Sequence, residues 1–187
     1  MVRQSHDVKL KGDKRLRNRL PTVLYSGGIA SAYTAWLVRK LSPVLLYTDT
    51  GWESKDTMPF MEAVAHVCDL TITRRADGRT PEQLFWDEHV LGNNRMPVCS
   101  HKLKTDQCVF WIEEQRSQGF EPVLYFGIMP GQDEHRAERI RERYYHMPIT
   151  PVECCFPLIE KRQLTINAQD WPISNKSLIR FFEEELG

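Results

Sequence analysis

The feature that most constrains the fold is a strand–helix–strand pattern near the start of the chain. A short apolar run over residues 22–25 breaks into Ser26-Gly27-Gly28, and apolar residues at helical spacing follow over 30–41. A second apolar run over 43–48 then ends in Asp49-Thr50-Gly51. Such a βαβ unit places polar residues at the carboxyl ends of two strands, which is where open α/β sheets bind ligands. The pattern therefore predicts an α/β fold with a ligand site at one edge of its sheet.

The Ser26-Gly27-Gly28 turn has the composition of a phosphate cradle. Adjacent glycines allow a tight turn that brings backbone N–H groups against a ligand, and the helix that follows directs its positive N-terminal end at the same point. The hydroxyl groups of Ser26 and Ser31 would add donors. A plain strand-to-helix turn is the alternative interpretation, because Gly-Gly pairs are common in such turns.

Apolar runs and helical patterns alternate along the rest of the chain. Strands are expected at 22–26, 43–48, 69–73 and 122–128, and helices at 30–41, 55–67, 80–90, 104–118 and 175–186. This alternation predicts an open, mostly parallel sheet with helices on both faces, a Rossmann-like α/β fold. The chain has 187 residues, of which 41% are hydrophobic, so it is long enough for one such domain and short for two. We therefore expect a basic N-terminal arm over 1–20 and a single domain over 21–187.

Five segments resemble the motifs of one enzyme superfamily, in the same order along the chain. They are 26–31, 47–51, 99–104, 127–136 and 156–160. They are similar, in turn, to the pyrophosphate loop, the Asp-Thr-Gly strand end, the Cys-x-x-x-Leu-Lys segment, the Gly-x-Arg-x-x-Gln/Glu-Ser-x-x-Arg element and the Pro-Leu-Ile segment of the phosphoadenosine phosphosulfate (PAPS) reductase-like branch. That branch belongs to the adenine nucleotide α-hydrolase-like, or PP-loop, superfamily. The resemblance implies that residues 21–187 form a PP-loop nucleotide-binding domain of the HUP type.

The resemblance also implies an adenine nucleotide, ATP or PAPS, at the carboxyl edge of the sheet. The residues that would bind its phosphates or sulfate are Ser26, Gly27, Gly28, Ser31, Thr50, Gly51, Lys102, Lys104, Gly127, Arg136 and Arg139. Arg136 and Arg139 lie in the segment 135–143, whose alternating charges also suit a solvent-exposed helix. Arg141 and Arg143 are expected at the surface of that helix.

Two residues are candidates for catalysis. Cys99 falls on a family motif beside Lys102 and Lys104, whose positive charge would favour the reactive thiolate. Asp49 could bind ribose hydroxyls, orient a water or help to hold Mg²⁺ against the phosphates. A turn or helix-capping role is the alternative for Asp49. Trp52 follows the strand end and could line the base pocket, or pack at the core like the other tryptophans.

The chain departs from the family pattern at three places. Ile29 and Ala30 stand where most PP-loop ATP pyrophosphatases have Lys and Asp, a pair that sulfonucleotide reductases also lack. Met129 and Asp133 replace an arginine and a serine of the later element, so two expected anion contacts are absent. No cysteine lies beyond Cys155, whereas PAPS reductases resemble one another in a catalytic cysteine near the C-terminus. The resemblance therefore supports nucleotide binding more strongly than a particular reaction.

Three functions remain open on this pattern. The first is a PP-loop enzyme that holds an adenine nucleotide for α-phosphate cleavage or sulfur transfer. The second is a PAPS or adenosine phosphosulfate reductase, which would need Cys99 or an external thiol, with a thioredoxin-type reductant as partner. The third is a non-catalytic nucleotide- or partner-binding module that has kept the cradle.

The five cysteines are an odd number in a chain without a secretion signal, which favours reduced thiols over a disulfide framework. Cys99, His101 and the adjacent Cys154 and Cys155 could supply ligands for zinc or an iron–sulfur cluster. The absence of any Cys-x-x-Cys pair disfavours both, so no metal site is predicted. Cys68 and Cys108 are expected to be buried and inert.

The basic arm over 1–20 has seven Lys or Arg and two Asp, a net charge of +5 in a chain whose net charge is +0. It could hold nucleic acid by neutralising phosphates, or it could be a solvated leader, or it could pack against the acidic remainder. No apolar run approaches the ~20 residues that span a bilayer. We therefore expect a cytoplasmic protein without a membrane segment.

Overall fold

The computed structural model describes residues 18–92, 97–131, 134–146, 151–160 and 173–186. Its centre is a five-stranded sheet in which every neighbouring pair of strands is parallel. The strands are β1 (Arg19–Leu24), β2 (Val44–Asp49), β3 (Ile72–Ala76), β4 (Glu121–Tyr125) and β5 (Glu153–Cys155), in the spatial order β3-β2-β1-β4-β5. The predicted open parallel α/β fold is confirmed.

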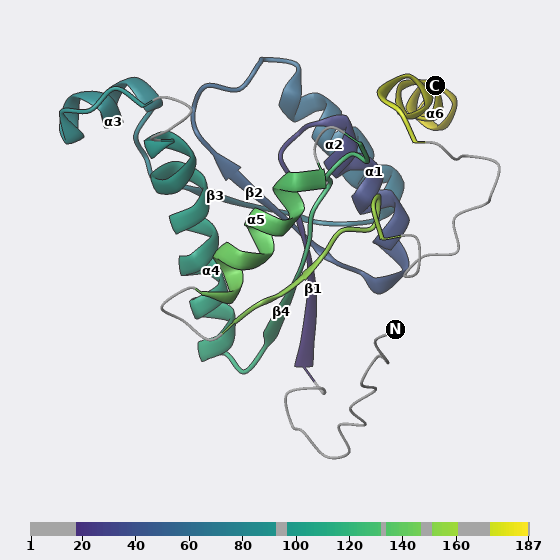
Figure 1. Ribbon diagram of the computed structural model, residues 1–187. Helices are drawn as coiled ribbons and strands as arrows, with labels where there is room; N and C mark the ends of the chain where they lie inside the picture. Colours follow the sequence, from purple (N-terminus) through teal and green to yellow (C-terminus); the bar gives the residue numbers. More distant parts are fainter. Residues whose placement is uncertain (1–17, 93–96, 132–133, 147–150, 161–172, 187) are drawn as a thin grey trace, which may run out of the picture.

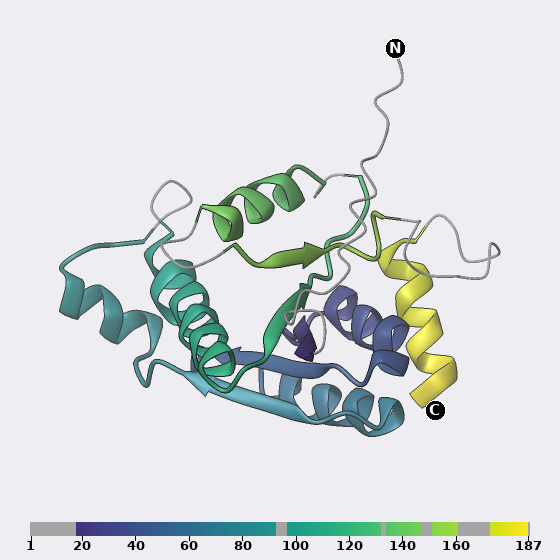
Figure 2. The same cartoon turned by 90° about the horizontal axis from the view of Figure 1, so that it is seen from below.

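Helices connect the strands. They are α1 (Ile29–Val38), α2 (Thr57–Cys68), α3 (Pro81–Glu88), α4 (Asp106–Ser117), α5 (Glu134–Tyr145) and α6 (Asn175–Leu186), with a 3₁₀ turn η2 (Arg39–Leu41) after α1 and a π-helical turn η3 (Ser100–Thr105) before α4. The five expected helices are all present. A Thr80 capping box and a proline in the first turn begin α3, which projects away from the rest of the molecule (Figures 1 and 2).

The central strands β1, β2 and β4 are largely apolar because helices cover both faces of the sheet, whereas the edge strand β3 contains Arg74 and Arg75. Alternate residues of one strand face opposite layers, so Leu45 and Tyr47 pack with α1, α2 and α6, whereas Leu46 packs with α4 and α5. Figure 2 shows these helices on the two sides of the sheet. Leu45, Leu46 and Tyr47 are all at most 2% exposed, which is why the strand reads as a continuous apolar run.

The connections that leave β1 and β4 run over opposite faces of the sheet. β1 is followed by α1, which packs in one layer, and β4 is followed by α5, which packs in the other. Because β1 and β4 are neighbours, their carboxyl ends form a topological switch point, the place where open α/β sheets accept ligands. The segments that leave this point are Ser26-Gly27-Gly28 and Gly127 with its neighbours.

Aromatic side chains fix the last helix against the first layer. The Phe181 ring lies edge-on to Tyr33 and Trp36, with centroids 5.0 and 4.7 Å apart, and Phe182 lies edge-on to Phe60 of α2 at 5.7 Å. Leu178 and Phe182 are buried in the same layer. α6 therefore covers α1 and α2 together.

Four strands differ from the sequence expectation. β3 covers Ile72–Ala76 where 69–73 was expected, and β4 ends at Tyr125 where 128 was expected. β1 begins at Arg19, because residues 19–23 pair along their length with residues 121–125 of β4, so the last two residues of the expected arm belong to the sheet. Residues 1–17 of that arm lie outside the described part of the chain. β5 was not expected, because three residues are too few to give a pattern. Among the described helices, none is both long and apolar enough to cross a bilayer.

Arg141 is not simply a surface residue of α5. Its guanidinium forms an ion pair with Glu160 and lies 4.5 Å from the centroid of the Phe156 ring. Glu160 also accepts a hydrogen bond from the backbone N–H of Phe156, at 3.2 Å. Arg141 therefore ties α5 to the 156–160 segment, a contact between distant parts of the sequence that the helical charge pattern could not reveal.

Candidate functional site at the switch point

The turn after β1 is shaped by a glycine that has no room for a side chain. Gly27 has φ +77°, a conformation that favours glycine, and a Cβ there would clash with Thr57 Cγ2 and lie 3.1 Å from Met61 Sδ. Thr57 and Met61 belong to α2. The turn is therefore held against α2 by close packing as well as by its own backbone.

The Ser31 hydroxyl holds this turn together from inside. Ser31 is buried, and its hydroxyl donates to the Gly28 carbonyl at 2.7 Å. Its oxygen accepts from the backbone N–H and the hydroxyl of Ser26, each at 3.3 Å. Ser31 was predicted to contact phosphate; its described hydrogen bonds instead fix the shape of the turn, whereas Ser26 is exposed.

The N-terminus of α1 opens beside the turn without a side-chain cap. Gly28 is the N-cap residue, with φ −81° and ψ 152°, and no side chain accepts a hydrogen bond there. An added Cβ at Gly28 would meet only Ser26 Oγ, at 3.6 Å, and the residue is exposed. α1 therefore begins uncapped at an exposed residue, with the positive end of its dipole toward that residue, as at helix N-termini that bind anions.

Gly127 brings the end of β4 to the same point. A Cβ on Gly127 would lie 2.5 Å from the backbone nitrogen of Ser31 and 2.6 Å from the carbonyl carbon and oxygen of Ala30. The chain after β4 therefore crosses directly over the first turn of α1. Two of the motif segments, 26–31 and 127–136, meet here as the sequence predicted.

Asp49, at the end of β2, is engaged on both carboxylate oxygens. Its Oδ1 accepts the backbone N–H of Gly51 at 2.7 Å, and its Oδ2 forms an ion pair with Arg74 of β3. The structure thus gives Asp49 the turn role that was its alternative interpretation, with an added partner. Beneath it, burial raises the pKa of Tyr47 to about 12, with a further contribution from the Asp49 charge, so that the Tyr47 hydroxyl remains protonated.

Thr50 and Lys104 meet at a residue that the sequence did not single out. The buried Thr50 hydroxyl donates to Glu53 Oε1 at 3.1 Å, and Lys104 Nζ lies 3.9 Å from the same oxygen. The π-helical turn η3 therefore approaches the carboxyl end of β2. Lys102, on the same turn, faces the end of β3: the pKa of Asp77 is lowered chiefly by its hydrogen bond with Arg79, and Lys102 adds to the effect.

Cys99 lies at the start of η3, on the side that faces α3. Its Sγ would be 3.4 Å from a Cβ on Gly92, a position that also adjoins the Phe85 ring. Arg136 and Arg139 are exposed on α5, in the layer that does not contain α1. The described contacts therefore bring Gly127 to the turn after β1 and Lys104 to the carboxyl end of β2. Cys99 instead lies near Phe85 of α3.

Three of the other thiols lie in surroundings that suppress their ionisation. All five cysteines are free. Burial raises the pKa of Cys108 and of Cys154 to about 12 and that of Cys155 to about 11. Only the thiolate is nucleophilic, so a raised pKa protects these sulfurs at neutral pH.

We expect iodoacetamide at pH 8 to alkylate Cys99 at least about tenfold faster than Cys154, although both residues are partly exposed. The Cys154 rate should rise about tenfold for each pH unit up to its raised pKa, because the thiolate fraction rises in that proportion. Peptide mass spectrometry of the native protein measures both rates, and Cys99→Ser should remove the fast site. Equal rates at the two cysteines would contradict this assignment.

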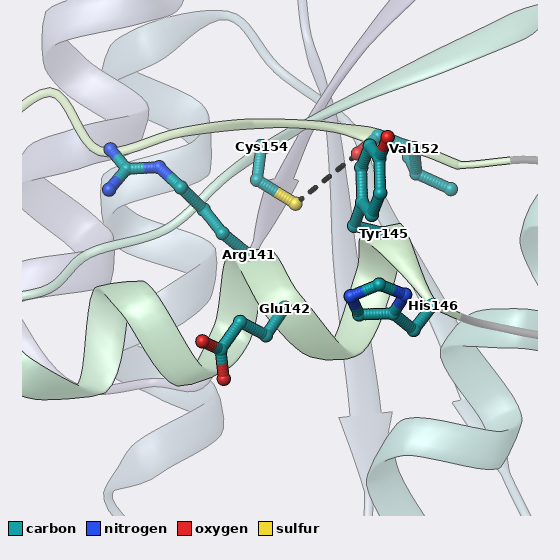
Figure 3. A pocket seen from close by; sticks show the side chains of 6 residues that line it. All are labelled: Arg141, Glu142, Tyr145, His146, Val152 and Cys154. Carbon is teal, nitrogen blue, oxygen red and sulfur yellow. Dashed lines mark hydrogen bonds between the residues drawn. The ribbon is translucent and has the colours of Figure 1, made fainter.

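Two cavities lie away from the switch point. One, of about 320 Å³, lies between α5 and the β5 strand (Figure 3) and is lined by Arg141, Glu142, Tyr145, His146, Val152 and Cys154. The Cys154 thiol there donates to the Val152 carbonyl at 3.6 Å. The other, of about 450 Å³, lies against α3 and is lined by Glu82, Phe85, Trp86, His89, Val90 and Leu91. Neither lining includes a residue of the predicted nucleotide site.

Within the described ranges, no group of three or more His, Cys, Asp or Glu side chains could hold a metal ion. The fold and the turn define a Rossmann-like α/β protein with an uncapped helix N-terminus at the switch point of its sheet. Comparison with family models gives no match, and no curated protein matches the chain either.

Proposed function

We propose that the chain is a PP-loop adenine-nucleotide-binding enzyme, similar to PAPS reductases, that acts by α-phosphate cleavage or sulfur transfer. The observation that carries the proposal is the contact of Gly127 with the backbone of Ala30 and Ser31, beside the uncapped start of α1. Two segments that resemble one family's phosphate-binding motifs meet there, at the edge where α/β sheets bind ligands.

Under this proposal the backbone supplies most of the phosphate contacts. The N–H groups of the turn and of the first turn of α1 bind the anion, and the helix dipole favours its charge. Lys102 and Lys104 on η3, with Arg136 on α5, supply positive charge for a phosphate or sulfate whose charge grows during the reaction. Trp52 is 61% exposed directly after the β2 end, which suits stacking on an adenine ring.

A cytoplasmic location is part of the proposal. Five free thiols support it, because oxidising compartments convert such cysteines to disulfides.

The non-catalytic binding module is the second candidate, and Asp49 favours it. Both of its carboxylate oxygens already have partners in Gly51 and Arg74, so Mg²⁺ or a water would have to share these oxygens with them. The reductase alternative needs Cys99 or an external thiol, and Cys99 lies toward α3. Binding and turnover must therefore be measured separately.

The test titrates ATP, AMP, adenosine phosphosulfate and PAPS against the purified chain by calorimetry, with and without Mg²⁺. Turnover is then followed as pyrophosphate or sulfite release in the presence of a thioredoxin-type reductant. We expect at least one nucleotide to bind and to be turned over. Binding without turnover would favour the module, and sulfite release that Cys99→Ser abolishes would favour the reductase. Failure of all four nucleotides to bind would refute the proposal.

A further inference from the structure

α5 carries its charges in two separate rows. Glu134, Glu138 and Glu142 follow one another at four-residue spacing and so lie along one side of the helix. Arg136, Arg139 and Arg143, spaced by three and four residues, lie along another side and are all exposed; we call them the basic stripe. The buried side, with Ala137 and Tyr144, packs on the sheet layer.

Contacts on two sides of α5 show what its charged rows lie against. Arg143 Nη1 donates to Thr105 Oγ1 at 3.3 Å, so the basic stripe lies toward η3 and the start of α4. Glu142, the last residue of the acidic row, lines the cavity between α5 and β5 together with Tyr145 and Cys154 (Figure 3). The basic stripe starts in the first turn of α5, which follows the β4 end of the switch point.

Helix stability does not account for this separation. Like charges at four-residue spacing destabilise a helix, and this spacing occurs between Glu134 and Glu138, between Glu138 and Glu142, and between Arg139 and Arg143. The arginine outside the basic stripe, Arg141, is the one that ties the helix to the 156–160 segment. Opposite charges at three-residue spacing, Glu138 with Arg141 and Arg139 with Glu142, offset part of this repulsion, so the two rows bring no clear net gain in helix stability.

We propose that the basic stripe binds the phosphate backbone of a nucleic acid. Guanidinium groups bind phosphate oxygens through two parallel hydrogen bonds, and such contacts position a strand without reading its sequence. At 1.5 Å per residue, Arg136 and Arg143 are separated by ~10 Å along the helix axis, about the axial length of three nucleotides in one strand. A regular row of single negative charges matches this linear array, and the acidic row repels a polyanion from the other side.

The test measures how salt affects binding to a fluorescein-labelled, mixed-sequence RNA of about 20 nucleotides. Fluorescence anisotropy gives the Kd at KCl concentrations between roughly 50 and 200 mM, where phosphate contacts dominate the salt dependence. In the full-length chain, R139Q/R143Q should raise the Kd about tenfold and reduce the slope of log K against log[salt] by about 1.4, since each lost contact to a single strand removes about 0.7. A labelled DNA strand of the same sequence, run in parallel, should respond alike.

K176Q/R180Q is the matched control, because it removes two exposed positive charges from α6, in the other layer of the sheet. Its Kd and slope should equal those of the native chain. Thermal melts should be unchanged for both double variants, since the four side chains are exposed.

Four results would overturn the proposal. The first is that the native chain does not bind RNA at the lowest salt concentration, and the second is that both double variants lose the same RNA affinity. The third is that polyglutamate displaces RNA as readily as unlabelled RNA does. The fourth is that K9Q/K11Q/K14Q loses RNA binding while R139Q/R143Q does not. The third would indicate an acidic protein partner, and the fourth would assign binding to the basic arm. None of these outcomes depends on whether a nucleotide binds at the switch point.

Discussion

Gly28→Asp should reduce the affinity for any nucleotide about 100-fold while the fold remains at least as stable. Gly28 is the N-cap of α1, and its extended backbone and open surroundings accept a side chain. An Asp carboxylate there would accept hydrogen bonds from the first-turn N–H groups, which are the groups proposed to bind phosphate. It would also place a negative charge against the ligand, a juxtaposition that costs about 3 kcal/mol and therefore about two powers of ten in Kd.

The comparison with Gly28→Ser separates charge from bulk. Serine caps a helix about as well as aspartate but carries no charge, so its effect on the Kd should be about tenfold or less. Calorimetric titration with ATP and with PAPS measures the affinities, and thermal unfolding should show both variants within ~0.5 kcal/mol of the native chain. Unchanged binding by a folded Gly28→Asp protein would show that the ligand lies elsewhere.

Gly127→Ala should destabilise the protein by about 3 kcal/mol, the upper end of the usual cost of overpacking. The added methyl group would lie 2.5 Å from Ser31 N and 2.6 Å from two backbone atoms of Ala30, and backbone cannot rotate away as a side chain can. Relief requires the chain after β4 to move away from α1 at the carboxyl edge of the sheet. For a chain of this size the expected loss in Tm is about 10 °C.

Chemical denaturation gives the free energy of unfolding for this comparison, with Gly28→Ser as the control for adding a side chain where a Cβ has room. The control should unfold at nearly the native denaturant midpoint. A native midpoint for Gly127→Ala would mean that the two segments are not in the close contact that joins them at the candidate site.

The central strands β1, β2 and β4 could be predicted because their buried residues read as apolar runs, and the helices from their spacing of apolar residues. The edge strand β3 contains Arg74 and Arg75 and was expected three residues too early, and β5 was missed because its three residues carry too little pattern. The start of β1 was placed too late because Arg19 and Leu20 are partly exposed and belong to the strand through pairing with β4, which the local pattern does not contain.

Parts of the candidate site could be predicted only where a short sequence motif marks them. The turn and Gly127 were singled out from glycine motifs, and the structure shows that neighbouring atoms leave no room for a side chain at Gly27 or Gly127. The pairing of Asp49 with Arg74 was not, because it depends on how β2 and β3 align. The meeting of Lys104 with Glu53 was missed for a similar reason, since it joins η3 to the loop after β2.

The crowding around Gly27 and Gly127 has a thermodynamic consequence for recognition. Gly27 packs against Thr57 and Met61 of α2, and Gly127 packs against Ala30 and Ser31 of α1, so the turn is confined from two sides. A loop shaped by steric exclusion loses its conformational entropy when the chain folds, and not when a ligand arrives. Under the proposed function, an anion bound there would not have to order the loop, so a turn without a lysine would bind it through backbone groups.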